Sequence, residues 1–393
     1  MSFINRFMKL GGGSLAALLV AVQAYGAAME GSASTTSKLS FGGDLRIRQE
    51  SFLNPGADDR HRQRLRLRFG VKADMEKWGA AFKLASGTGE QVSTNQTFGN
   101  SWNQKNIYLD QAYVTARPKD WLKVHAGKQE NPFWRVYSSD LVWDSDLNPE
   151  GFSEQASLDV NDRVSVFGNF LQAPVNEISG SKRDPWLFGN QIGVQAKLGG
   201  GLRWNIAVAN YAVSHEDVSV LHATSSVDST VLLGDNTRVA GGGALLAGQF
   251  HMAHVTTELG FQAGVPIRLQ GDFVRNVHDR KTNGQDAGYQ VGLIAGSAKT
   301  AGSWEGGLFK KFVEANATLS DLADADWGNG GTNRKGVVLW LAHACTDFLV
   351  LQAKYSMTER VDPFINTSHP YTATSTHRPN NINRLQLDAV LKF

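Results

Sequence analysis

Apolar and polar residues alternate along most of the chain from Lys38 onward, in runs of about ten to fourteen residues. In residues 61–75 an apolar row of side chains opposes a charged row: Leu65, Leu67, Phe69 and Val71 against Arg64, Arg66, Arg68 and Lys72. Successive side chains of a β-strand point to opposite faces, whereas a helix repeats every ~3.6 residues. The pattern therefore predicts strands with one apolar and one polar face.

Sixteen segments of this kind can be assigned along the chain. They cover residues 38–52, 61–75, 78–87, 104–117, 121–130, 150–158, 163–172, 186–198, 201–213, 239–254, 265–277, 286–298, 302–316, 334–345, 348–360 and 381–393. The alternation is least regular in 150–158, 239–254 and 302–316, where glycines or neighbouring residues of like character interrupt it.

The breaks between the segments are short and long in turn. The short ones include 76–77, 118–120, 199–200 and 346–347, and the long ones 88–103, 131–149, 214–238, 317–333 and 361–380. An even number of strands closes a barrel with both chain ends on one side. The predicted fold is an all-β, transmembrane antiparallel β-barrel of about 16 strands, with short periplasmic turns and long extracellular loops.

A soluble β-sandwich also alternates, so strand length has to separate the two folds. Strands of globular proteins have ~5–6 residues, whereas a tilted strand needs ~9–11 to cross a bilayer. The segments fit the longer class. Their apolar faces also hold many alanines, glycines and single aromatic residues, which suit lipid better than an interdigitated core. Both observations favour the barrel.

The start of the chain has the layout of a secretory signal. Residues 1–28 contain Arg6 and Lys9, then an apolar stretch at 15–22, then small residues. The apolar stretch is too short for a membrane anchor that crosses ~30 Å. We expect residues 1–28 to be a cleaved signal peptide, which leaves 29–393 as a single transmembrane barrel domain.

The last segment ends on an aromatic residue, Phe393. Because the final strand of a closed barrel pairs with the first, a chain that ends inside a full-length strand leaves no uncovered edge. Phe393 resembles the terminal phenylalanine that serves outer-membrane barrels as an assembly signal. We therefore expect it to be read by the barrel-assembly machinery.

Composition excludes several classes of protein. The 393 residues are 41% hydrophobic and 19% charged, which excludes a disordered chain. No apolar run approaches the ~18–20 residues of a membrane-spanning helix. The 39 Lys+Arg nearly balance the 37 Asp+Glu, too even for a protein that binds nucleic acid. The single Cys345 can form neither an internal disulfide nor a thiolate metal site.

Motifs for enzymes, cofactors and metals are lacking. No G-x-S-x-G nucleophile motif or glycine-rich phosphate loop occurs, so we expect neither catalysis nor a cofactor. His251 and His254 are three residues apart, which places them on opposite faces of a strand and argues against a shared metal. The acidic residues in 321–329 miss the spacing of a calcium loop. We expect that segment to be a solvated surface loop.

Five stretches resemble the putative porin family of Gram-negative outer membranes. They are residues 41–48 (FGGDLRIR), 62–70 (RQRLRLRFG), 106–114 (NIYLDQAYV), 125–134 (HAGKQENPFW) and 141–151 (LVWDSDLNPEG). The second half of the chain is similar to the family mainly in its strand pattern and terminal phenylalanine. The resemblance implies a barrel with a water-filled lumen and does not imply a solute.

Basic side chains gather on the polar face of the first two strands. We call this set the arginine wall: Arg46, Arg48, Arg64, Arg66 and Arg68. In hydrocarbon each would cost about 2–4 kcal/mol at mid-depth, so we expect the wall to line the lumen. Further basic residues are expected to extend it: Lys83, Lys123, His125 and Lys128.

The long break at 131–149 contains Asp140, Asp144 and Asp146 among several aromatic residues. If it folds inward, its carboxylates face the arginine wall and form a constriction with a transverse field. The alternative is that the lumen charges are solvated or paired locally. In that case, carboxylates on the same strands would neutralise the arginines: Asp44, Glu50 and Asp74.

The expected function is an outer-membrane porin, a water-filled channel for passive diffusion of small hydrophilic solutes and ions. The arginines leave a substrate-selective channel for anions or organic acids as one alternative. An exported soluble β-rich binding protein is another. The expected partners are the outer-membrane bilayer, the barrel-assembly machinery and the solutes, and a homotrimer is among the oligomeric states that stay open.

Overall fold

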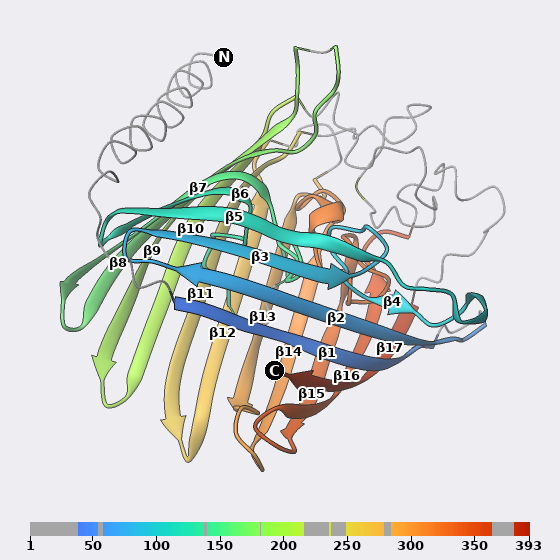
Figure 1. The fold of residues 1–393 in the computed structure, drawn as a ribbon. Coiled ribbons are helices and arrows are strands. Elements are labelled where there is room, and N and C mark those ends of the chain that lie inside the picture. The colour runs from blue at the N-terminus through green and yellow to red at the C-terminus, as the bar shows by residue number, and fades with distance from the viewer. Residues whose placement is uncertain are drawn as a thin grey trace.

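The alternating strands close into one antiparallel barrel (Figure 1). A computed structural model describes residues 38–53, 58–136, 140–180, 182–215, 236, 249–278, 284–363 and 381–393. The strands are β1 (Lys38–Leu53), β2 (Arg60–Asp74), β3 (Trp78–Ser86), β4 (Gln96–Thr97), β5 (Ile107–Lys119), β6 (Leu122–Lys128), β7 (Glu150–Asn161), β8 (Val164–Pro174), β9 (Trp186–Gly199), β10 (Leu202–Val213), β11 (His251–Ala263), β12 (Val265–Asn276), β13 (Ala287–Gly296), β14 (Trp304–Val313), β15 (Arg334–Ala344), β16 (Leu349–Arg360) and β17 (Asn381–Lys392). Two short 3-10 helices lie in loops of the described residues: η1 (Asn100–Trp102) and η4 (Ser320–Leu322).

Sixteen of the described strands form the wall, as the sequence predicted. The other, β4, is a two-residue strand inside the β3–β5 connection, where it pairs with β2. The connections are short at one end of the barrel and long at the other, so that a single residue joins β11 to β12 while residues 87–106 join β3 to β5. No helix in the described part of the chain is long and apolar enough to span a membrane.

The barrel is closed by pairing between its first and last strands. β1 and β17 run antiparallel in register from Asp44↔Lys392 to Leu53↔Asn383. One further pair of backbone bonds extends this seam: Gly43 N–H donates to Phe393 O at 2.9 Å, and Phe393 N–H donates to Gly43 O at 3.2 Å. Figure 1 shows the end of the chain beside β1.

The apolar faces of the strands point outward and the charged faces inward. On β2, Leu67 is 38% exposed and Phe69 40%, whereas Arg64 and Arg66, on the other face of the strand, are 7% and 9% exposed. Such an arrangement is unfavourable in water, because it exposes a continuous apolar belt. It suits a barrel surrounded by lipid and filled with polar groups.

One strand lies elsewhere than the sequence indicated. The alternation predicted a strand at 239–254, but β11 spans His251–Ala263 and the two overlap by four residues. Residues 239–248 lie outside the described part of the chain. Gly264 forms the whole β11–β12 turn with a φ of +74°, a conformation that glycine adopts without strain. β11 runs directly up to this turn, so residues 255–263, which the alternation predicts as a break, belong to the strand. Thr257 stands in the otherwise apolar row of this segment and weakens the alternation there.

Deleting Phe393 tests its expected role in assembly. The deletion removes both backbone bonds to Gly43 and the terminal ring, so we expect the yield of folded, heat-modifiable barrel to fall several-fold. Lys392→Gln is the matched control, because the Lys392 side chain lies on the opposite face of β17. Equal yields of the two variants, measured by gel shift of outer-membrane fractions, would contradict the role.

Candidate functional site in the barrel lumen

Three long connections in the part of the chain that the structure describes enter the lumen instead of covering its rim. They are the 87–106 loop, the 129–149 loop and the 314–333 loop. The 129–149 loop leaves the wall early because β6 has only seven residues. Each loop buries a run of side chains, for example Val92–Gln96 in the first of them. The lumen is therefore narrowed from several sides.

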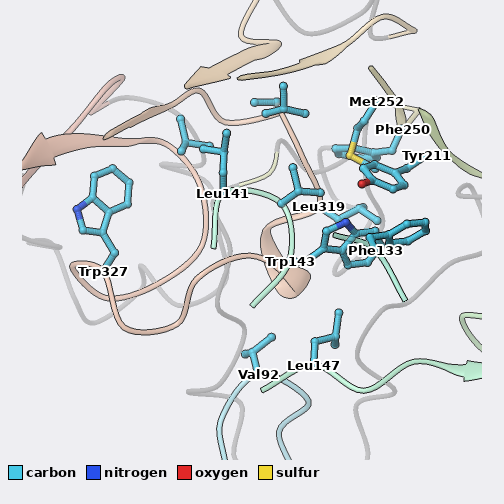
Figure 2. Packing of buried hydrophobic residues seen from close by; sticks show 14 of the residues in the cluster. Val92, Phe133, Leu141, Trp143, Leu147, Tyr211, Phe250, Met252, Leu319 and Trp327 are labelled. Carbon is cyan, nitrogen blue, oxygen red and sulfur yellow. The ribbon is translucent and has the colours of Figure 1, made fainter. Parts of the chain in front are cut away.

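Aromatic packing holds the 129–149 loop against the far wall (Figure 2). Tyr211 on β10 is fully buried, and its ring centroid lies 4.9 Å from Phe133 and 5.0 Å from Trp143, both edge to face. Pairs of this geometry contribute about 0.5–1.5 kcal/mol each beyond their buried area. The loop is thus fixed at the end remote from the arginine wall.

The 314–333 loop is not the solvated surface loop that its acidic sequence suggested. Asp321 is 1% exposed and Trp327 is fully buried. Lys311 on β14 explains the position of the loop, because its ammonium lies 3.0 Å from the Asp324 carboxylate and 4.7 Å from the centroid of the Trp327 ring. A lumen-facing cation therefore draws the acidic segment inward.

The two acidic loops are bonded to each other. Asp144 N–H donates to Leu322 O at 2.7 Å, and Asp324 N–H donates to Asp140 O at 3.1 Å. In addition, Ala325 N–H donates to the Asp144 carboxylate at 2.9 Å. These bonds make the loops one body, with Asp144 at its centre.

Carboxylates of this body reach the arginine wall. Asp326 lies between two strands, 2.7 Å from Arg48 on β1 and 2.8 Å from Arg384 on β17. Asp146 lies 3.2 Å from Arg68 on β2. Acidic loop residues are therefore paired directly with basic strand residues inside the barrel.

Local pairing, the alternative arrangement, is present at the same time. The Asp44 carboxylate is 2.7 Å from both Arg66 and Arg68. Glu50 is fully buried and bonded to Arg62 and Arg384. Asp74 takes no part in the wall, since it pairs with Arg117 at 2.7 Å.

The loop carboxylates differ in the proton affinity that their surroundings give them. Burial, and next the Asp324 carboxylate, raise the pKa of Asp140 to about 7. Burial and the carboxylates of Asp140 and Asp146 raise the pKa of Asp144 well above its usual range. Burial acts in the same direction on Asp326, but Arg48 and Arg384 overcome it and hold its pKa well below the usual range.

Three of the further basic residues lie on the inward side, away from the arginine wall. Lys83 on β3 pairs with Asp110 at 2.7 Å. His125 on β6 contacts the Thr115 hydroxyl at 2.9 Å, and Lys123 shares its face and is exposed. None of the three contacts an arginine of the wall among the described residues.

Lys128 does not join this face. It lies three positions after His125, an odd offset, so it has the opposite orientation on β6. Its ammonium lies 3.0 Å from Glu150, its cross-strand partner on β7. Lys128 therefore belongs to the outward side of the strand end where the 129–149 loop leaves the wall.

Sequence reasoning missed important members of the cluster on β17. Arg384 is 2% exposed, and Asp388 bonds Arg48 through both carboxylate oxygens at 2.7 and 2.8 Å. Both alternate with Leu385 and Leu387, and a closed barrel pairs β17 with β1. This alternation, together with the expected pairing of the last strand with the first, could have placed both residues beside the arginine wall.

A cavity of about 550 Å³ remains between the wall and the loops. In the described part of the chain, nine cationic and seven acidic side chains line it: Arg46, Arg48, Arg66, Arg68, Arg268, Lys299, Lys311, Lys354 and Lys392 against Asp140, Asp144, Asp146, Glu305, Asp324, Asp326 and Asp388. Across the described residues, no three His, Cys, Asp or Glu side chains are grouped to hold a metal. His254 contacts Asp272 at 2.7 Å, whereas His251 contacts Asn210 on the opposite face.

Comparison with known proteins identifies the family. The chain matches the family described as "Putative porin" over residues 48–239 and 218–393. No curated protein sequence matches significantly.

Two solved porins are similar in fold. One is OprB of Pseudomonas putida at high pH, with a TM-score of 0.54, 14% identity and coverage of 90% of this chain and 94% of that one. The other is OmpF of Salmonella typhi in complex with daunomycin, with a TM-score of 0.53, 10% identity and coverage of 91% and 98%. At these identities the likeness concerns the fold alone. Together with the sequence match, it shows that the chain belongs to the putative porin family and forms a β-barrel channel of the outer membrane.

Proposed function

We propose that the barrel conducts small hydrophilic solutes and ions by passive diffusion, through a constriction between the arginine wall and the two bonded acidic loops. The observation that carries this proposal is the pair of short contacts from Asp326 to Arg48 and Arg384, 2.7 and 2.8 Å. They join the 314–333 loop to β1 and β17 inside the barrel. Fixed charges of opposite sign on facing sides orient dipolar solutes and favour small, hydrated ones.

An excess of cations supports a second candidate, a channel that prefers anions or organic acids. Among the described residues, nine cationic and seven acidic side chains line the cavity. Two of these acids, Asp140 and Asp144, have raised pKa values and so lose charge more readily than free aspartates. A positive lumen raises the local concentration of anions. An exported soluble protein does not agree with the family or the apolar exterior.

Residues at both ends of the chain complete the proposal. Residues 1–28, outside the described part, would direct export and be removed, and Phe393 would direct assembly by the barrel-assembly machinery. A homotrimer is one assembly compatible with the apolar outer wall. These three points are independent of the constriction and are tested separately from it.

Replacing Arg64, Arg66 and Arg68 together with glutamine tests the role of the wall. The change removes three positive charges and frees Asp44, so we expect the ratio of anion to cation permeability to fall by about twofold or more. The measurement is the reversal potential of the refolded protein in planar bilayers across a KCl gradient. Salt should stay below about 0.1 M, because at that concentration the screening length is only about 10 Å and the field of the wall is partly masked.

Arg203→Gln is the control for that experiment. Arg203 faces inward on β10 but is exposed and remote from the wall, so its loss should leave selectivity nearly unchanged. If the triple variant assembles and keeps the wild-type reversal potential, the wall does not border the conducting path.

The raised pKa of Asp140, about 7, predicts a pH dependence. As pH falls from 8 to 6 the Asp140 carboxylate becomes neutral, so the constriction gains positive charge and anion preference should increase. At both pH values, Asp140→Asn should have the selectivity that the wild type has at pH 6, because its side chain is always neutral. If Asp140→Asn responds to pH as the wild type does, a group other than Asp140 is responsible.

A further inference from the structure

Four arginines of the wall form a square on β1 and β2. Arg46 is the cross-strand partner of Arg66, and Arg48 is the partner of Arg64. All four are at least nine-tenths buried. Four guanidinium groups so close together repel one another strongly unless each has a counter-charge.

One diagonal of the square is well neutralised. Arg48 is bonded to Asp388 through two contacts of 2.7 and 2.8 Å and to Asp326 through a third of 2.7 Å. Arg66 lies 2.7 and 2.9 Å from the Asp44 carboxylate. These two arginines have permanent partners within the protein.

The other diagonal, Arg46 and Arg64, is not. The carboxylate oxygen nearest to Arg46 belongs to Asp388, at 4.0 Å, and the one nearest to Arg64 belongs to Glu50, at 3.9 Å. Both carboxylates are already engaged, Asp388 by Arg48 and Glu50 by Arg62 and Arg384. Arg46 and Arg64 therefore hold the least neutralised charge of the square.

Neutral groups from the 87–106 loop hold these two guanidinium groups in place. Arg46 Nη2 donates to Asn95 Oδ1 at 2.6 Å. Arg64 Nη2 donates weakly to Asn95 O at 3.4 Å and to Ser93 Oγ at 3.5 Å. Within the described residues neither Arg46 Nε nor Arg64 Nε has an acceptor. The site thus has two fixed cations and two unused buried donors.

We propose that Arg46, which Asn95 holds in place, binds a small oxyanion such as phosphate or a carboxylate in the lumen, and that the charge of Arg64 strengthens this binding. Arg46 and Asn95 line the cavity of about 550 Å³, which is large enough for such an ion with several waters. Guanidinium groups bind carboxylate and phosphate oxygens through charge-assisted bonds. This inference rests on the proposed channel function and names the solute class for it.

Inorganic phosphate, acetate and succinate are the probes, added to a KCl solution of constant ionic strength. We expect phosphate to reduce the chloride conductance of the wild-type channel in a saturable way. Calorimetric titration of the detergent-solubilised barrel should give the affinity without any need for conduction. The order of the affinities for the three probes distinguishes a phosphate site from a carboxylate site.

Arg46→Gln and Asn95→Asp are the decisive variants. The first removes one cation, and the second supplies a carboxylate of the same shape that pairs with Arg46 from within the protein. Each should weaken phosphate binding by about tenfold or more, since at least one charge-assisted bond is lost. Arg203→Gln, which removes a lumen cation elsewhere, should bind phosphate as the wild type does.

The outcomes separate the site from the channel. If the wild-type protein conducts chloride but binds phosphate no more tightly than Asn95→Asp, the site is refuted while the channel stands. If phosphate binds and both variants lose it, but no conductance is measured, the site stands and the proposed function fails.

Discussion

Hydrocarbon offers no hydrogen-bond partner to a peptide group, so a barrel of this kind exists only if its first and last strands pair. The β1–β17 seam meets that requirement from Asp44 to Leu53. The same seam brings Arg384 and Asp388, near the end of the chain, beside Arg48 and Glu50 near its start. Closing the sheet therefore also assembles the charged centre of the lumen.

That charged centre explains why the loops fold inward. Buried guanidinium groups are costly unless carboxylates accompany them, and the strands alone do not neutralise the wall. Asp326 and Asp146 come from two different loops to do so. Apolar packing around Tyr211 fixes the 129–149 loop at its far end. The arginine wall and the loops stabilise each other, and the ion pairs between them keep the loops in the lumen and narrow it.

The fold could be predicted because a period of two is a local property of the sequence. The site could be predicted only in part, because its contacts join distant segments. Arg48 and Asp326 are 278 residues apart, and nothing in the local spacing of the 314–333 loop indicates that Lys311 draws it inward. Lys128 was misplaced for a simpler reason, since its parity on β6 differs from that of His125. The expected pairing of the last strand with the first would have placed Arg384 beside β1.

A channel that binds its solute must also release it, so the charges that attract the solute must not be permanently paired within the protein. The register of the strands decides which arginines meet this condition. Asp388 is the cross-strand partner of Arg48, whereas Val390 is the partner of Arg46. No carboxylate can therefore reach Arg46 from the directly opposite position. Because Asn95 supplies hydrogen bonds without negative charge, it orients the guanidinium group and leaves its charge available to an ion in transit.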